Sequence, residues 1–186
     1  MTETEYFTSD EKNTLLALAR EAIKCKLTNT ELHKFDSVPE KFQKQQASFV
    51  TLRSPNGQLR GCIGNIEPFE TLIESVPHNA RNAAMHDPRF ASVDSIAELD
   101  SLRIEISVLT PPEEVESYKD IVIGKHGIIL RMNNRGAVFL PQVATEQGWS
   151  RDSTLSHLSL KAGLPANAWK DEKCKFKVFE AIYFSE

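Results

Sequence analysis

Cysteine is scarce in this sequence, and the three cysteines present, Cys25, Cys62 and Cys174, lie far apart. Their number is odd and no CxxC pair occurs, so neither a disulfide framework nor a cysteine-rich zinc site is expected. The five histidines form no HExxH or HxH spacing, and no metal ligand can be named. We expect reduced thiols in a cytoplasmic protein.

Long apolar runs are also missing. No run approaches the roughly 20 residues that span a bilayer. The segment MTETEYFTSDEK is acidic and polar, and it lacks the basic-then-apolar order of a signal peptide. We therefore expect a soluble, cytoplasmic protein without a membrane partner.

Basic residues form no block beyond the dispersed KCKFK, and the formal net charge is -4. Nucleic-acid binders usually concentrate Lys and Arg on one face, so a nucleic-acid partner is not indicated. GxGxxG, Walker A, GxSxG and EF-hand patterns are absent from the sequence, which disfavours the corresponding chemistries. The sequence names no cofactor and does not decide whether the protein is an enzyme.

What is present is the make-up of one globular domain. The chain has 186 residues, of which 40% are hydrophobic and 26% charged, close to average globular composition. At this length roughly two-thirds of the unfolded surface can be buried. The core therefore needs no disulfide or metal to hold it.

Two helical regions are predicted in the first half. Thr8 and Glu11 fit a capping box ahead of a helix over 9–26, where apolar residues recur at helical spacing. Residues 69–85 also have helical spacing, but Pro77 is expected to divide them into two pieces.

Strands are predicted on either side of these helices. Residues 48–53 and 58–66 flank SPNG, where Asn56-Gly57 favours a hairpin with a type I′ turn. Residues 102–109 alternate between apolar and other side chains, as in a strand with one buried face.

The second half predicts another hairpin, from GIILRM and GAVFLPQ around NNR. Ser150 can cap a helix that runs to about Ala162, with Gly163 as the residue that ends it. Residues 174–184 are predicted to form a last strand, in which a shift of phase near Glu180 suggests a bulge. Interspersed helices and antiparallel strands predict a mixed α+β fold.

The stretch QLRGCIGN holds the most unusual cysteine. In a regular strand Arg60 and Cys62 would share one face, roughly 6–7 Å apart. A guanidinium there would favour a Cys62 thiolate. Glycine weakens a strand unless a backbone or ligand approaches closely, so Gly61 and Gly64 are candidate binding positions. The alternative is structural, because free cysteine is often a small buried apolar group.

Two further segments hold candidate binding residues. In NAAMHDPRF, Asp87 could orient His86 for acid–base work or pair with Arg89 at a corner, with Phe90 filling the core. In GKHGIIL, His126 could bind a metal or move protons, although a lone histidine at the entry of a strand is more often a turn residue.

Together, LRGCIGN, NAAMHDPRF, LRIEISVLTPPEE, GKHGIIL, RGAVFLPQVATEQGW and LSLKAGLPANAW resemble the AMMECR family, also called protein A of the AmmeMemoRadiSam system. The resemblance covers roughly residues 10–184. It implies one α+β domain over 1–186, with a larger lobe holding both termini, a smaller lobe and a cleft between them. Many relatives carry cysteine where this chain has Ser159, so a site that needs that thiol is in doubt here.

The resemblance also implies Memo-type and radical SAM proteins as partners, but no particular reaction. Two hypotheses follow for a cytoplasmic protein of undetermined oligomeric state. In the first, Cys62 is a nucleophile or redox group assisted by Arg60 in a functional cleft. In the second, LRGCIG is structural, and the protein is a non-catalytic adaptor or a sensor of a small molecule or nucleotide.

Overall fold

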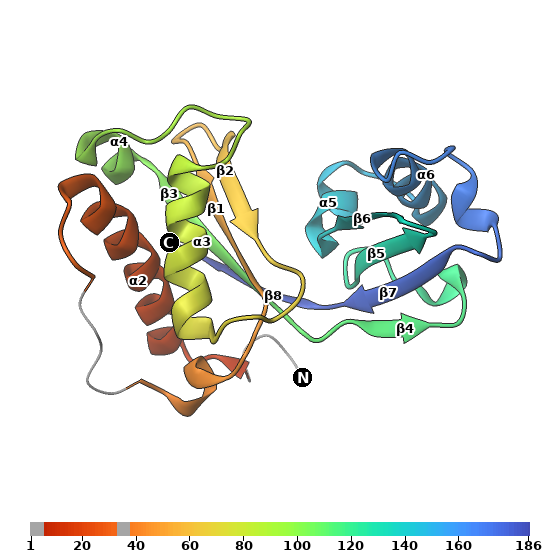
Figure 1. Ribbon diagram of the computed structural model, residues 1–186, viewed down its shortest axis with the longest axis horizontal. Helices are drawn as coiled ribbons and strands as arrows, with labels where there is room; N and C mark the ends of the chain where they lie inside the picture. The colour runs from red at the N-terminus through yellow and green to blue at the C-terminus, as the bar shows by residue number, and fades with distance from the viewer. Residues whose placement is uncertain (1–5, 33–37) are drawn as a thin grey trace. The chain divides into compact units, whose positions relative to one another are not determined.

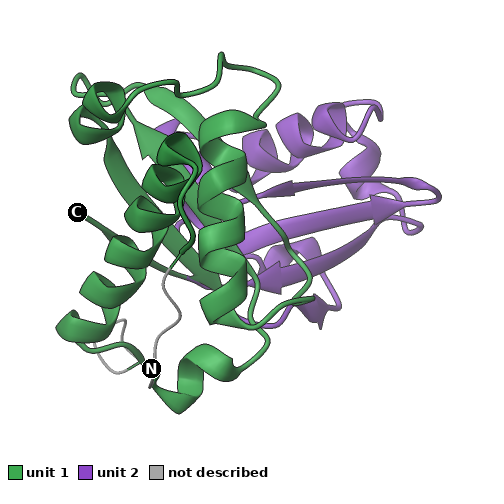
Figure 2. Ribbon diagram, turned by 60° about the vertical axis from the view of Figure 1, so that its left-hand side comes forward, with its two compact units in different colours: residues 1–109, 182–186 green, residues 110–181 purple. Residues whose placement is uncertain are grey.

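The computed structural model describes residues 6–32 and 38–186. The chain divides into two compact units. The first comprises residues 1–109 and 182–186, and the second comprises residues 110–181 (Figure 2). Each unit has its own four-stranded sheet and its own apolar core. The predicted mixed α+β fold is confirmed.

The first unit is a sheet with helices packed on one face (Figure 1). Its strands pair in the order β2-β1-β3-β8, which leaves β2 at one edge. Its elements are α2 (Ser9–Thr28), η1 (Glu40–Gln43), β1 (Ser48–Arg53), β2 (Leu59–Gly64), α3 (Leu72–Met85), α4 (Ile96–Ser101), β3 (Arg103–Leu109) and β8 (Ala181–Ser185).

The core of the first unit lies between this sheet and the helices α2 and α3, which lie side by side. Alternate residues of β1 and β3 enter it, including Val50, Leu52, Ile104 and Ile106, which are fully buried. Thr51, Arg53 and Glu105 therefore project from the opposite face, because successive strand side chains point to opposite sides.

The predicted first helix is confirmed and extends to Thr28. Thr8 and Glu11 form the predicted capping box: Thr8 Oγ1 accepts from the Glu11 amide, and Glu11 accepts from the Thr8 amide. This arrangement satisfies two amides that have no partner inside the helix.

The prediction of two helical pieces over 69–85 is wrong, because α3 continues through Pro77. Val76, Pro77 and Ala80 are all buried, and α3 packs against α2, β1 and β2. The missing proline amide removes one helical hydrogen bond. Burial on both sides of Pro77 offsets that loss, so tertiary packing decides the outcome.

The first hairpin is confirmed, but its predicted type I′ turn is wrong. Only Gly57 has a positive φ, of 82°, whereas a type I′ turn also needs one at Asn56. The Gly57 amide donates to the Ser54 carbonyl at 2.8 Å, and Pro55 occupies the next position. Since proline fixes φ near -65°, as a type I turn requires, the loop is a type I turn followed by a left-handed glycine.

The second unit is a sheet of order β4-β7-β5-β6 with α6 beside it. The predicted hairpin of β5 and β6 is confirmed, as is the Ser150 cap of α6. Gly163 follows this helix with φ of 71°. The elements are β4 (Glu113–Val115), η2 (Tyr118–Asp120), β5 (Gly127–Met132), β6 (Arg135–Phe139), α5 (Pro141–Glu146), α6 (Arg151–Lys161), η3 (Ala168–Lys170) and β7 (Lys175–Phe179).

The single last strand predicted over 174–184 is two strands. β7 belongs to the second sheet and β8 to the first, with Glu180 between them. The shift of phase is therefore a change of sheet and not a bulge. Thr110 and Glu180 hydrogen bond to each other where the chain passes between the units, through two bonds of 2.9 Å.

Candidate functional site

The two glycines of the LRGCIG stretch let β2 pack closely against its neighbours. A Cβ atom on Gly61 would lie 3.0 Å from the Ala83 carbonyl carbon of α3 and closer still to its oxygen. A Cβ on Gly64 would overlap the Ser48 carbonyl oxygen and the Phe49 ring. At both positions glycine allows a neighbouring backbone to approach closely. This requirement accounts for the two glycines, and no bound ligand is needed to explain them.

The Cys62 side chain lies on the face of this strand opposite Gly61 and is half-buried. Thr51, its cross-strand partner on β1, donates from Oγ1 to Cys62 Sγ at 3.1 Å. Burial raises the pKa of the thiol, while the Thr51 hydrogen bond and the charges of Arg89 and Arg53 act in the opposite direction. Burial has the largest effect, so the thiol is the dominant form at neutral pH.

The backbone of Cys62 is held by the loop that follows α3. Its amide donates to Asp87 Oδ2 at 2.9 Å, and its carbonyl accepts from Arg89 Nη2 at 3.3 Å. Asp87 also accepts from the Arg89 amide, Nε and Nη2. The side chains of this pair thus satisfy the outer edge of β2 where the sheet ends.

Asp87 is a buried carboxylate with a charged partner, since its side chain is only 2% exposed. The Arg89 guanidinium holds the pKa of this carboxyl far below its usual range, and the Cys62 and Arg89 amides add to the effect. Of the two roles open to Asp87, the structure shows the pairing with Arg89.

The expectation that Arg60 shares a regular strand face with Cys62 is wrong. The register of β1 and β2 shifts between Leu52 and Arg53, which pair with Gly61 and Leu59, so Arg60 is the extra residue of a bulge. Such a residue leaves the regular alternation. Arg60 binds Glu98 Oε1 through Nε at 2.8 Å and the Ala91 carbonyl through Nη1 at 2.7 Å. It thus ties β2 to α4 and to the preceding loop.

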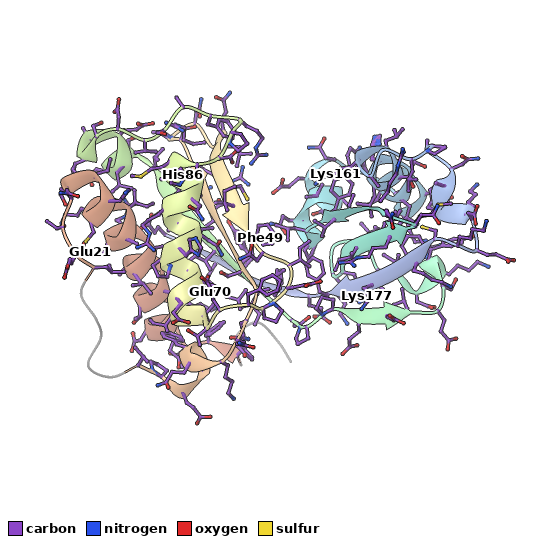
Figure 3. All side chains as sticks on the ribbon, in the orientation of Figure 1. Glu21, Phe49, Glu70, His86, Lys161 and Lys177 are labelled. Atoms are coloured by element: carbon purple, nitrogen blue, oxygen red, sulfur yellow. The ribbon has the colours of Figure 1, made fainter. Side chains whose placement is uncertain are left out.

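His86 and Phe90 lie on either side of Asp87 and do not join it in a site. His86 is exposed at the end of α3 (Figure 3), with Nδ1 3.1 Å from Asn82 Oδ1. Phe90 is only partly buried, so the expectation that it fills the core is wrong. The Arg89 guanidinium lies over its ring, 5.3 Å from the centroid. This stacking keeps Phe90 at the surface with Arg89.

His126 belongs to the second unit, whereas the other candidate residues belong to the first. Its Nδ1 accepts from the Val122 amide at 3.2 Å, and its own amide donates to the Val122 carbonyl at 2.9 Å. Burial and the neighbouring Lys125 lower the pKa of the imidazole. These bonds make His126 a residue of the turn before β5, which matches the structural alternative.

Sequence reasoning missed a group of side chains beside Cys62. The polar face, as we call it, is the surface of the first sheet opposite its helices, and it comprises Thr51, Arg53, Cys62, Arg103, Glu105 and Tyr183. Glu105 is directly opposite Thr51, which is directly opposite Cys62. The alternation over 102–109 contained the signal, because the residues between the apolar ones face away from the core.

Within residues 6–32 and 38–186, no group of three or more His, Cys, Asp or Glu is arranged to hold a metal ion. No helix in the same ranges has the length and apolar character to cross a membrane. Ser159 is buried in α6, where its hydroxyl donates to the Leu155 carbonyl at 2.9 Å.

The fold and this site together define an α+β protein with a half-buried thiol on a glycine-flanked edge strand. A family model, AMMECR1, matches residues 16–184. Protein MK0488 of Methanopyrus kandleri is 41% identical over 189 residues, which cover 98% of this chain and 91% of that protein. Protein MJ0810 of Methanocaldococcus jannaschii is 42% identical over 158 residues, with 81% of this chain and 78% of that protein covered.

A solved structure has the same fold. The crystal structure of protein PH0010 from Pyrococcus horikoshii superposes with a TM-score of 0.86 at 37% identity, over 93% of this chain and 90% of that chain. The chain therefore belongs to the AMMECR1 family, and the resemblance inferred from its motifs is confirmed.

Proposed function

We propose that this protein is a non-catalytic accessory protein that binds a small ligand on the polar face and acts with Memo-type and radical SAM partners. The observation that carries the proposal is that the LRGCIG residues make structural contacts within the first unit. Gly61 and Gly64 make backbone contacts, and Arg60 is bound by Glu98. The motif builds the edge of the sheet and leaves the polar side chains beside it for binding.

The state of Cys62 supports this assignment. A nucleophilic cysteine needs a lowered pKa, usually from a nearby cation or base. Here burial raises the pKa of Cys62, and the arginine nearest in sequence is occupied by a carboxylate. A neutral thiol of this kind lines a surface and supplies little reactivity.

The competing function is catalytic, with Cys62 as nucleophile or redox group and Arg60 stabilising charge in a cleft. One observation favours it: Cys62 is half-buried and not part of either core, and Arg89 and Arg53 act to lower its pKa. A ligand that brought its own positive charge would strengthen that effect.

Alkylation as a function of pH separates the two functions. Iodoacetamide labelling of the native protein is followed peptide by peptide by mass spectrometry, with Cys174 as an internal reference. Burial raises the pKa of Cys174 to about 11. We expect the Cys62 labelling rate to keep rising beyond the ordinary thiol pKa of about 8.5. A plateau at or below pH 8 would favour the catalytic function.

Partner capture tests the remainder of the proposal. Purified Memo-type and radical SAM proteins are incubated with tagged wild-type protein and with Cys62→Ser, which keeps the side chain small and polar. We expect equal capture by both, because the thiol is not required. If Cys62→Ser no longer captures the partners although its circular dichroism spectrum is unchanged, the claim that the LRGCIG motif is only structural would be wrong.

A further inference from the structure

The helix-covered side of the first unit contains an open hollow of about 870 Å³, which we call the α3 hollow. Its volume lies within the range of small-molecule sites, roughly 300–1,000 Å³. The ring of Phe69 borders the hollow and is 69% exposed, so it offers apolar surface to a ligand. The apolar lining comes from α2, α3 and the loops beside them: Leu18, Leu32, Val38, Phe69, Ile73 and Pro77.

A half-buried arginine without a partner lines the same hollow. Arg81 lies on α3, and within residues 6–32 and 38–186 no carboxylate, carbonyl or aromatic ring binds its guanidinium. The guanidinium is always charged and carries five N–H donors. Partial burial of an unpaired charge costs free energy, and an anion from solution would offset that cost.

The acidic residues of the hollow are engaged by other side chains. Glu70 Oε1 lies 3.0 Å from His78 Nδ1, and Glu74 Oε2 accepts from the Thr71 amide and hydroxyl. Glu70 lies beside the first turn of α3 (Figure 3), and Glu74 lies within that turn. Seven residues separate Glu74 from Arg81, so the two lie on one face of α3, about 10 Å apart along its axis. The hollow is therefore acidic at the start of α3 and basic two turns later.

We propose that the α3 hollow binds a small organic carboxylate, with its charged group on Arg81 and its apolar body against Phe69 and Ile73. The planar fork of a guanidinium matches the two oxygens of a carboxylate. The carboxylates of Glu70 and Glu74 disfavour a phosphate, which carries nearly two negative charges. The inference goes beyond the proposed function, because it assigns a second ligand site on the side of the sheet opposite the polar face.

The experiment titrates full-length protein labelled with ¹⁵N, using hexanoate and, separately, the uncharged 1-hexanol as probes. Sodium chloride keeps the ionic strength constant, so that screening does not change during the titration. We expect saturable shifts with hexanoate at the amides of residues 73, 78 and 81. The Kd for 1-hexanol should be at least about tenfold higher, because it cannot form the charge-assisted hydrogen bonds.

Two substitutions should change the Kd for hexanoate in opposite directions. In Arg81→Gln we expect a Kd at least about tenfold higher, because the charged donor is lost. In Glu74→Gln we expect a Kd about twofold lower, because a negative charge about 10 Å from the bound carboxylate is removed. Glutamine can replace glutamate in a capping box, so the start of α3 is kept.

Lys12→Gln is the matched control, because it removes a positive charge from α2 at a position that does not line the hollow. Its Kd for hexanoate should equal that of the wild-type protein. Unsaturable shifts with hexanoate, an equal Kd for hexanoate and 1-hexanol, or an equal Kd for Arg81→Gln and the wild type would each overturn the inference. None of these results bears on the alkylation profile of Cys62 or on partner capture, so the proposed function is tested separately.

Discussion

Asp87 illustrates how much of the site depends on one side chain. Its carboxylate joins the edge of β2, through the Cys62 amide, to the loop after α3, through Arg89. Sequence reasoning identified the Asp87–Arg89 pair as one of two alternatives. It could not show that the pair also holds Cys62, because that contact links positions 25 residues apart.

The low pKa of Asp87 makes its contribution depend on pH. A carboxyl with a folded pKa below its unfolded value of about 3.9 stabilises the protein above that pH, and the contribution is lost as the pH falls. We expect Asp87→Asn to lower the free energy of unfolding by about 2 kcal/mol at pH 7, since bonds to a charged group are lost. The gap between wild type and variant should shrink at pH 3.

Urea unfolding at pH 7 and pH 3 measures both values. Asp94→Asn is a suitable control, because Asp94 is an exposed acidic residue in the same loop. Its effect should stay within about 0.5 kcal/mol at either pH. An Asp87→Asn gap that is the same at both pH values would show that the charge of Asp87 is not what stabilises the fold.

At the scale of elements, the contact between β2 and α3 depends on Gly61. We expect Gly61→Ala to lower the free energy of unfolding by about 3 kcal/mol, because its Cβ would meet the Ala83 carbonyl and one of the two backbones would have to move. Thermal or urea unfolding provides the measurement.

Gly57→Ala is the matched control for this prediction. Nothing lies within 4 Å of a Cβ at Gly57, but its φ is positive. The cost there should be limited to backbone strain, about 1–2 kcal/mol. If Gly61→Ala lowers the free energy of unfolding no more than Gly57→Ala does, then β2 and α3 can move apart without a loss of stability, which contradicts the prediction.

Elements with local signals were predictable, and those decided by tertiary contacts were not. The capping box of α2 and the hairpin of β1 and β2 follow from neighbouring residues, and both were found. The short strand β4 was missed because Glu113–Val115 has no pattern of its own and exists through pairing with β7. The continuity of α3 through Pro77 depends on burial, which the sequence does not display.

At the scale of the whole molecule, the second unit is an insertion between two strands of the first sheet. β3 and β8 are neighbours in that sheet, yet residues 110–180 separate them in the sequence. The two lobes implied by the family resemblance, and a cleft between them, stay predictions. The site residues stay predictions too, because the motif identifies the strand but not what binds there.

The insertion predicts that the first unit can fold without the second. Replacing residues 111–179 with Asn-Gly would join Thr110 to Glu180, which already hydrogen bond to each other, through a two-residue hairpin turn. We expect this shortened protein to unfold cooperatively and to keep dispersed amide signals in its NMR spectrum. A non-cooperative transition with lost near-ultraviolet dichroism would contradict an independent core.

The same insertion dictates an order of events on the ribosome. β8 is synthesised only after every residue of the second unit, so the sheet of the first unit stays one strand short throughout that interval. The bond from Arg20 Nε on α2 to Glu186, 2.7 Å long, can also form only after the second unit has been synthesised. The second unit, whose residues are continuous in the sequence, can assemble while the first is unfinished. If translation slows within the second unit, the edge of β3 that later pairs with β8 stays unpaired for longer. Chaperones that bind unpaired strand edges would then have the most time to bind β3.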